Sequence, residues 1–507
     1  MASPEALLTN AIAPSKRKDR SALISALSNL SIQYNFTAIA VALAIMDNSA
    51  GNKDPSYVPA YPRTTLQEGL LKSLVFAGAI FGQISMGYAG DVLGRRNAMC
   101  LTNFLAFLGS LGSAVFTWGD AHTVYSILMG CRFFIGVGVG GKYPLSATMR
   151  SEACDEARDE ARTESHSQTQ VALGFFWQTP GGMLPYAVAL LVLQCFGRTD
   201  TSLTTVSIEF RIIFGLGAVP ALLVMLLCYA QEDSAEYKEV RRNARSTVEP
   251  LSQHHPSSPG SFYAPSSPSS STAQVHASAA APAHRRWIAT SNNPFAIALR
   301  HPEHWWRLMG TGLSWLVYDF VYYGTTVNQP AILDSVFGHA DSLWANCVQN
   351  IMVASFGLPG IVAAIAMLRC LGTKRLQAWG FVSLACSAAL FALVILVVPS
   401  STAASFGVFC LLITCLNWGA NVSTYVLPTE TFPTAVRSSF FGVSAAMGKV
   451  GALTGGALFG PIAASGAHGL PIVLLICTAL SIVGIWVTVY LVEPSGANSF
   501  FGCSRGV

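Results

Sequence analysis

Twelve apolar stretches, each long enough to cross a lipid bilayer as a helix, dominate the chain. A bilayer core needs roughly 20 apolar residues in a helix, which satisfies its own backbone hydrogen bonds there. The stretches fall at 24–47, 67–90, 97–117, 123–147, 169–195, 209–230, 306–330, 343–368, 376–398, 403–425, 437–462 and 468–492. We therefore expect an all-α membrane protein with twelve transmembrane helices.

The chain carries too few charges for a soluble protein of its size. Charged residues make up 11% of the 507 residues, whereas soluble domains hold about 25%. A membrane β-barrel would need alternating strands of about ten residues, which the continuous apolar stretches do not show. The net charge of +4 does not indicate a nucleic-acid partner. The 12 Cys follow no metal-binding or redox spacing, so we expect no metal site and no cofactor.

One polar segment divides the apolar stretches six and six. Residues 232–305 begin with charged residues and continue as a Ser-, Pro- and Ala-rich stretch that cannot bury enough apolar surface to fold. We expect a flexible linker whose Ser residues allow phosphorylation by kinases, although a plain solvated tether is the favoured interpretation. The predicted parts are a cytoplasmic N-terminus at 1–23, a bundle at 24–231, this cytoplasmic linker at 232–305, a second bundle at 306–492 and a cytoplasmic tail at 493–507.

Lys and Arg residues are distributed unevenly between the two predicted sides. With the N-terminus inside, the outer loops contain Lys53, Arg63 and Arg198, while most of the 30 Lys and Arg residues fall in inner segments. Cytoplasmic loops are enriched in these residues. Both termini are therefore predicted to be cytoplasmic.

A glycine and charge motif follows the second apolar stretch. It reads GYAGDVLGRR, and a weaker echo containing Gly372 follows the eighth stretch. The motif is similar to that of the major facilitator superfamily, and the resemblance implies two six-helix bundles related by an internal repeat. It also implies a tight turn and a charge cluster that latches the two bundles on the inner side. The residues of this inner latch would be Gly87, Asp91, Gly94, Arg95 and Arg96.

Ionisable and polar residues within the apolar stretches are candidates for function, because charge in mid-membrane is costly. Trp315, Asp319 and Tyr323 lie four residues apart and so share one helix face. Lys449 stands between glycines in mid-stretch. The bland interpretations are packing for Trp315 and hydrogen bonding between helices for the amides Gln178 and Asn421. Together, one Lys, one Asp and several neutral donors suit a small tetrahedral anion such as dihydrogen phosphate.

At these residues the chain resembles the phosphate:proton symporter family of the major facilitator superfamily, the fungal and plant high-affinity type. The likeness covers the whole membrane portion and rests on GGKYPLSATMRSE, on the spacing of Trp315, Asp319 and Tyr323, on GANVSTYVLPTETFPTAVR and on SAAMGK. Carried over position by position, the resemblance implies a phosphate site made of Tyr143, Gln178, Trp315, Asp319, Tyr323, Asn421 and Lys449.

Two positions depart from the family pattern. Lys142 stands where the family has an acidic residue, and Asn35 stands where an Asp would occur. The proton-coupling candidates are therefore Asp319 and Lys142. Three consequences remain open: Asp319 is the sole proton carrier, transport is coupled to another ion or to none, or Lys142 pairs with Asp319 or adds a second positive charge near the anion.

We therefore expect a carrier that moves inorganic phosphate by alternating access, coupled to protons or alternatively to sodium. The resemblance implies the plasma membrane. No nucleophile and base pattern or nucleotide loop is visible, so we expect no catalytic residues and no enzyme activity. Two alternatives remain: a carrier of the same superfamily for sugar or another organic ion, and a phosphate-sensing receptor without net transport.

Overall fold

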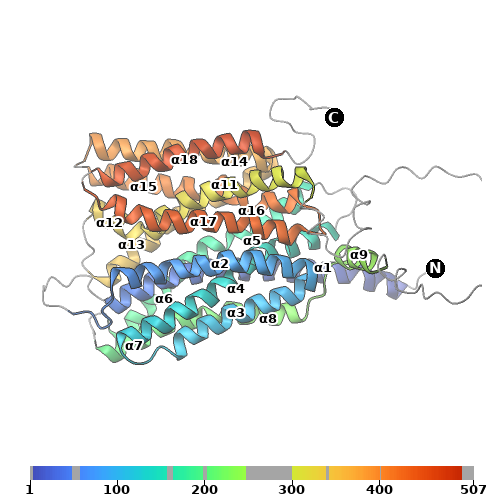
Figure 1. Cartoon of the computed structure of the whole chain (residues 1–507), viewed down its shortest axis with the longest axis horizontal. Coiled ribbons are helices and arrows are strands. Elements are labelled where there is room, and N and C mark those ends of the chain that lie inside the picture. The colour runs from blue at the N-terminus through green and yellow to red at the C-terminus, as the bar shows by residue number, and fades with distance from the viewer. Residues whose placement is uncertain are drawn as a thin grey trace, which may run out of the picture.

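The computed structural model describes residues 4–47, 58–156, 164–197, 202–246, 300–337, 342–399, 401–466 and 468–493, and the regular structure in these ranges is helical. The helices lie roughly parallel in one elongated stack (Figure 1). The first half contains α1 (Pro4–Asp47), α2 (Thr65–Leu93), α3 (Arg95–Val115), α4 (Ala121–Glu156), α5 (Glu164–Phe176), α6 (Gln178–Phe196), α7 (Leu203–Leu216), α8 (Ala218–Tyr229) and α9 (Ala235–Ser246).

The second half repeats this arrangement. It contains α11 (Pro302–Val327), α12 (Gln329–Phe337), α13 (Leu343–Ser355), α14 (Gly357–Val397), α15 (Thr402–Asn417), α16 (Ala420–Thr431), α17 (Arg437–Ala463) and α18 (Gly469–Leu491). Several crossings consist of two helices separated by a short break, as at Trp177, Gly217 and Phe356.

The twelve predicted crossings correspond to helices of the structure. Nine helical segments of the described chain are long and apolar enough to cross a membrane. The segment at 343–397 crosses twice, because Gly372 leaves the helical conformation with φ 72° and ψ 163°. The remaining crossings are α11 and α17. The prediction of an all-helical membrane protein with two six-helix bundles is confirmed.

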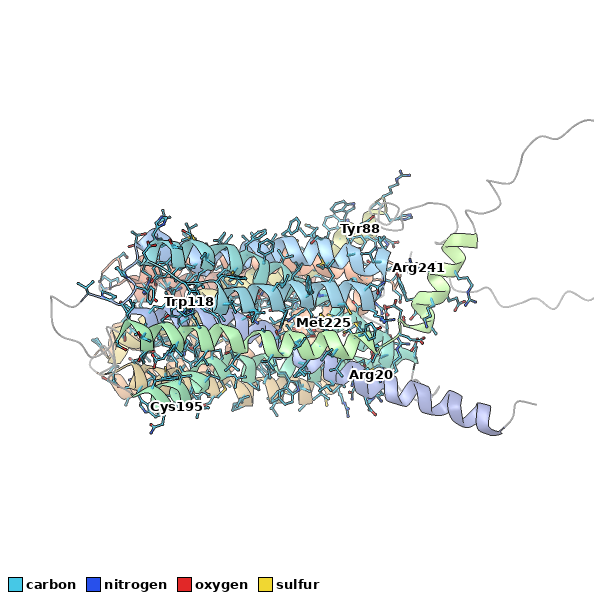
Figure 2. The ribbon with its side chains drawn as sticks, turned by 90° about the horizontal axis from the view of Figure 1, so that it is seen from below. Arg20, Tyr88, Trp118, Cys195, Met225 and Arg241 are labelled. Atoms are coloured by element: carbon cyan, nitrogen blue, oxygen red, sulfur yellow. The ribbon has the colours of Figure 1, made fainter. Side chains whose placement is uncertain are left out.

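The outer surface of the stack is apolar, as a lipid environment requires. Large hydrophobic side chains are exposed along the helices, among them Leu226 on α8 and Trp486 on α18. Figure 2 shows Trp118 and Cys195 at one end of the stack and Arg20 and Arg241 at the other. The chain is therefore a multi-pass integral membrane protein.

The two bundles meet closely where α2 crosses α17. Glycines allow this approach: a side chain at Gly442 would come within 2.1 Å of the carbonyl oxygen of Gln83, and one at Gly87 within 2.6 Å of that of Ser438. Contacts between α6 and α13 join the bundles toward the opposite end. The space between the bundles is thus bounded at both ends.

The predicted linker does not begin as unstructured chain. Residues 235–246 form α9, which is held by tertiary contacts: Ser234 donates to Glu152 at 2.8 Å, and Thr434 of the second bundle donates to Glu236 at 2.8 Å. Polar composition did not reveal these contacts. The rest of the predicted linker, with its candidate kinase sites, lies outside the described residues except at its C-terminal end.

Candidate functional site

A buried ion pair lies between α11 and α17 of the second bundle. Lys449 of α17 donates to Asp319 of α11 at 2.8 Å, and the two side chains are 1% and 4% exposed. Lys449 also donates to the hydroxyl group of Tyr323, one helical turn further along α11, at 3.1 Å. The cation therefore sits beside one carboxylate and one hydroxyl group, within reach of both.

Glycines on α17 bring Lys449 against α11. A side chain at Gly448 would come within 2.6 Å of the ring of Trp315, and one at Gly451 within 2.1 Å of the carbonyl oxygen of Leu316. The backbones of the two helices consequently pack directly, as small residues permit in membrane proteins. The short distance between helices is what places the Lys449 ammonium group beside Asp319.

Aromatic rings surround the ammonium group. The Lys449 nitrogen lies 4.2 Å from the ring centre of Tyr323, 4.9 Å from that of Tyr143 and 5.4 Å from that of Phe36. The hydroxyl groups of Tyr143 and Tyr323 are 3.4 Å apart. Because Tyr143 and Phe36 belong to the first bundle, both bundles contribute to the surroundings of one cation, which cation–π attraction stabilises.

Amide side chains close the other side of the site. Gln178 donates to Asn29 of α1 at 2.9 Å, and Asn29 donates to Tyr425 of α16 at 3.3 Å. Asn421 contacts Asn417 at 3.4 Å. Through Asn29, Gln178 of the first bundle is therefore linked to Tyr425 of the second bundle, while Asn421 bonds within the second bundle.

The structure brings all seven predicted site residues together around one small cavity. The cavity is lined by Tyr143, Phe175, Gln178, Trp315, Tyr318, Asp319, Tyr322, Tyr323, Asn421 and Lys449. The sequence interpretation missed Phe175, Tyr318 and Tyr322. The signal was available for the two tyrosines, because they lie three and seven residues after Trp315 and so fall on the same helix face.

The predicted inner latch is closed in this structure. Asp91 of α2 pairs with Arg95 at 2.8 Å and accepts hydrogen bonds from the backbone and the hydroxyl group of Ser439 on α17 at 2.7 and 2.6 Å. Arg95 also contacts Glu152 at 3.0 Å and donates to the carbonyl oxygen of Thr434 at 2.7 Å. These contacts join the first bundle to the second.

Gly94 and Arg96, two further residues of the predicted latch, do not take part in these contacts between the bundles. Gly94 has φ 103° and makes the turn between α2 and α3, which favours glycine. Arg96 contacts the first half of the chain: its backbone donates to Asp233 at 2.9 Å, and its side chain donates to the carbonyl oxygen of Tyr229 at 2.8 Å. Arg96 thus fastens the end of α8 and does not bridge the bundles in this conformation.

Lys142 does not lie in the cavity beside Asp319. Its ammonium group donates to Ser31 of α1 at 2.7 Å, and its side chain is fully buried inside the first bundle. Successive residues of a helix point about 100° apart, so Tyr143 faces the cavity while Lys142 faces α1. The open alternative in which Lys142 pairs with Asp319 does not occur in this conformation, in which Lys449 is the partner of Asp319.

The arrangement suits the binding of a small anion. Lys449 supplies a positive charge, the tyrosines, Gln178 and Asn421 supply neutral donors, and Asp319 supplies an acceptor for a protonated oxygen. Burial strengthens each of these interactions. The cavity contacts both bundles, so a movement of one bundle against the other would change its access.

The family model described as "Sugar (and other) transporter" matches residues 21–496. A protein of Toxoplasma gondii named inorganic phosphate transporter PT2 is 34% identical over 96% of this chain and 74% of its own length. The repressible high-affinity phosphate permease of Neurospora crassa is 26% identical over 80% of this chain and 71% of its own length.

Solved structures give the same fold. The major facilitator superfamily proton:xylose symporter bound to 6-bromo-6-deoxy-D-glucose superposes with a TM-score of 0.69 over 96% of this chain and 98% of its own, at 16% identity. A partially occluded, inward-open form of the xylose transporter from E. coli gives 0.63 over 95% and 99%, also at 16% identity.

Proposed function

Because the chain belongs to the sugar (and other) transporter family of the major facilitator superfamily, we propose that it carries inorganic phosphate across a membrane by alternating access. Its relatives are transporters and not enzymes. The observation that carries the choice of substrate is the buried pair of Lys449 and Asp319 at 2.8 Å inside a cavity lined by neutral donors. The names of the two relatives given above, an inorganic phosphate transporter and a phosphate permease, support the same substrate.

The proposed binding step exchanges partners around Lys449. An oxyanion of dihydrogen phosphate replaces Asp319 at the ammonium group, and the hydroxyl groups of Tyr143 and Tyr323 donate to its other oxygens. Asp319, released from the ion pair, accepts a hydrogen bond from a protonated phosphate oxygen or takes up a proton itself. An uncharged sugar has no negative charge with which to replace Asp319 at Lys449, so this exchange of partners requires an anion.

The proposed transport step is a rocking motion of the bundles about the cavity. The inner closure around Asp91, Arg95 and Ser439 must separate before the anion can leave toward the cytoplasm. We propose that Gly87 and Gly94 serve this closure by allowing close approach and a tight turn, and that Arg96 keeps the first bundle intact as it moves. Net uptake would be coupled to protons through Asp319, with sodium as the alternative ion.

We further propose that the protein resides in the plasma membrane with both termini in the cytoplasm. The uneven distribution of Lys and Arg supports this orientation. The start of α1, the position of α9 and the end of α18 at one end of the stack agree with it (Figure 1). A tag accessible to antibody only after the plasma membrane is permeabilised would support the orientation, and an accessible tag on intact cells would refute it.

The test of function is uptake of radioactive phosphate by the purified protein in liposomes, with proton and sodium gradients imposed separately. We expect uptake that a proton gradient accelerates and that unlabelled phosphate, but not glucose, suppresses. Retained phosphate binding without uptake would favour a sensing receptor. Competition by sugar would favour the sugar carrier.

A further inference from the structure

Tyrosines line much of the cavity, and three of their hydroxyl groups are already engaged in contacts with the protein. Tyr318 donates to the backbone carbonyl oxygen of Leu416 at 2.7 Å. The hydroxyl groups of Tyr143 and Tyr323 lie 3.4 Å apart, and that of Tyr323 also accepts a hydrogen bond from Lys449 at 3.1 Å. An anion that binds to any of these three groups must share or displace a contact that the group already has.

The fourth tyrosine that lines the cavity is Tyr322. Its hydroxyl group forms no hydrogen bond with any residue that the structure describes. Tyrosine hydroxyl groups that are removed from bulk water usually have a partner. Among the four tyrosines of the cavity, Tyr322 therefore keeps its hydrogen-bonding capacity unused in this conformation.

The ring of Tyr322 is fixed by its neighbours on α11. Its centre lies 5.6 Å from that of Tyr318 and 5.1 Å from that of Tyr323, the second in an edge-to-face arrangement. The ring also packs against two groups of core side chains, one around the cavity and one inside the second bundle. Because packing covers these sides, the partly exposed Tyr322 side chain is open toward the cavity that it lines.

A fixed hydroxyl group at this place suits an oxygen of phosphate. A phenol hydroxyl group both donates and accepts hydrogen bonds, so it can pair with an unprotonated or a protonated oxygen of the anion. Binding to Tyr322 breaks no hydrogen bond within the described protein. Its ring is held before the anion arrives, which lowers the entropic cost of the new contact.

We propose that Tyr322 is a specificity-determining residue, whose hydroxyl group bonds one oxygen of phosphate and thereby favours anions with four oxygens over those with three. The inference rests on the proposed function and adds a residue that selects the substrate. A site that hydrogen-bonds a group of its ligand rejects the analogue without that group, because the site's own polar group is left unpaired.

Phosphite is the probe for this contact, because a hydrogen atom bonded to phosphorus replaces one of the four oxygens. The singly charged forms of phosphate and phosphite carry the same charge, so Lys449 serves both equally. In the wild type, the P–H bond of phosphite must face a polar group of the cavity, and a hydrogen bond is lost. In Tyr322→Phe, the P–H bond can face the apolar ring instead.

The experiment measures the Kd of phosphate and of phosphite for the purified full-length protein in detergent by isothermal titration calorimetry. The pH is chosen so that both anions are mainly singly charged. We expect Tyr322→Phe to raise the Kd for phosphate about tenfold, or about 1.4 kcal/mol, and the Kd for phosphite about threefold or less. The preference for phosphate should therefore fall, and an unchanged preference would overturn the proposal.

Tyr34→Phe is the matched control. Tyr34 donates to the carbonyl oxygen of Ile213 inside the first bundle at 2.7 Å, away from the residues that line the cavity. We expect this variant to keep the wild-type preference for phosphate over phosphite. A similar loss of preference in Tyr34→Phe would overturn the assignment to Tyr322.

Unfolding in detergent distinguishes a binding role of Tyr322 from a structural one. Tyr322→Phe loses no hydrogen bond within the described protein and should unfold at the wild-type midpoint. A lower midpoint, together with an equal rise of both Kd values, would assign Tyr322 a structural role and overturn the proposal. Absence of phosphate binding by the wild type would instead refute the proposed function.

Discussion

Removing one partner of the buried pair should destabilise the protein far more than removing both. Lys449→Met leaves the Asp319 carboxylate uncompensated, and Asp319→Asn leaves the ammonium group uncompensated. Both side chains are at most 4% exposed. Breaking a buried pair in this way costs about 3–5 kcal/mol, because the remaining charge keeps its desolvation penalty. The double variant has neither charge and avoids that penalty.

The coupling between the two substitutions measures this effect. We expect the double variant to be at least about 2 kcal/mol more stable than the sum of the single losses predicts. The assay is unfolding of the purified protein in detergent by titration with dodecyl sulfate, followed by circular dichroism. An equivalent cycle on the partly exposed pair of Lys72 and Glu68, 2.6 Å apart, should give about 0.3–0.5 kcal/mol. Strict additivity at Lys449 and Asp319 would refute the reasoning.

Other predictions concern the packing and the inner closure. Gly451→Ala should impair folding, because its Cβ would lie 2.1 Å from the carbonyl oxygen of Leu316. Gly456→Ala is the control and should be tolerated, because its Cβ would meet open space. The yield of monodisperse protein and the midpoint of unfolding compare the two variants. Arg95 bridges the bundles, whereas Arg96 does not. A membrane-impermeant reagent added at the inner side should therefore reach the cavity faster in Arg95→Ala than in Arg96→Ala. Equal labelling rates in the two variants would contradict the latch.

The coupling of phosphate uptake to protons should also depend on the residue at position 142. Lys142→Asp restores an acidic residue beside Tyr143 and should strengthen the dependence of phosphate uptake on external pH. Uptake by liposomes across a pH series measures it, with Lys142→Arg as the control. An unchanged profile would remove Lys142 from the account of coupling.

Much of the site could be predicted from sequence because it lies on regular helices. The four-residue spacing of Trp315, Asp319 and Tyr323 fixes a common face, and Tyr322, seven residues after Trp315, lies beside it. The cost of intramembrane charge singled out Lys449 as well. The contact between Lys449 and Asp319 depends on the approach of α17 to α11, a tertiary property that periodicity alone does not give.

Two features were predicted less well, for different reasons. α9 is polar and short, and it is held by contacts that its own sequence does not reveal, such as the hydrogen bond from Tyr237 to the carbonyl oxygen of Asp91 at 3.0 Å. One of the alternatives left open placed Lys142 near the anion, although it directly precedes Tyr143 on a helix. Helical geometry already required these two neighbours to point in different directions.

The measurement that tests the central claim most directly is phosphate binding to purified Lys449→Met, by isothermal titration calorimetry in detergent. The Lys449 ammonium group is a charged hydrogen-bond donor, and losing such a donor costs about 1.5–3 kcal/mol of binding free energy. We therefore expect the Kd for phosphate to rise roughly tenfold to a hundredfold. Lys72→Met, outside the cavity, should bind as the wild type does. Binding of phosphate by a folded Lys449→Met protein with the wild-type Kd would contradict the account.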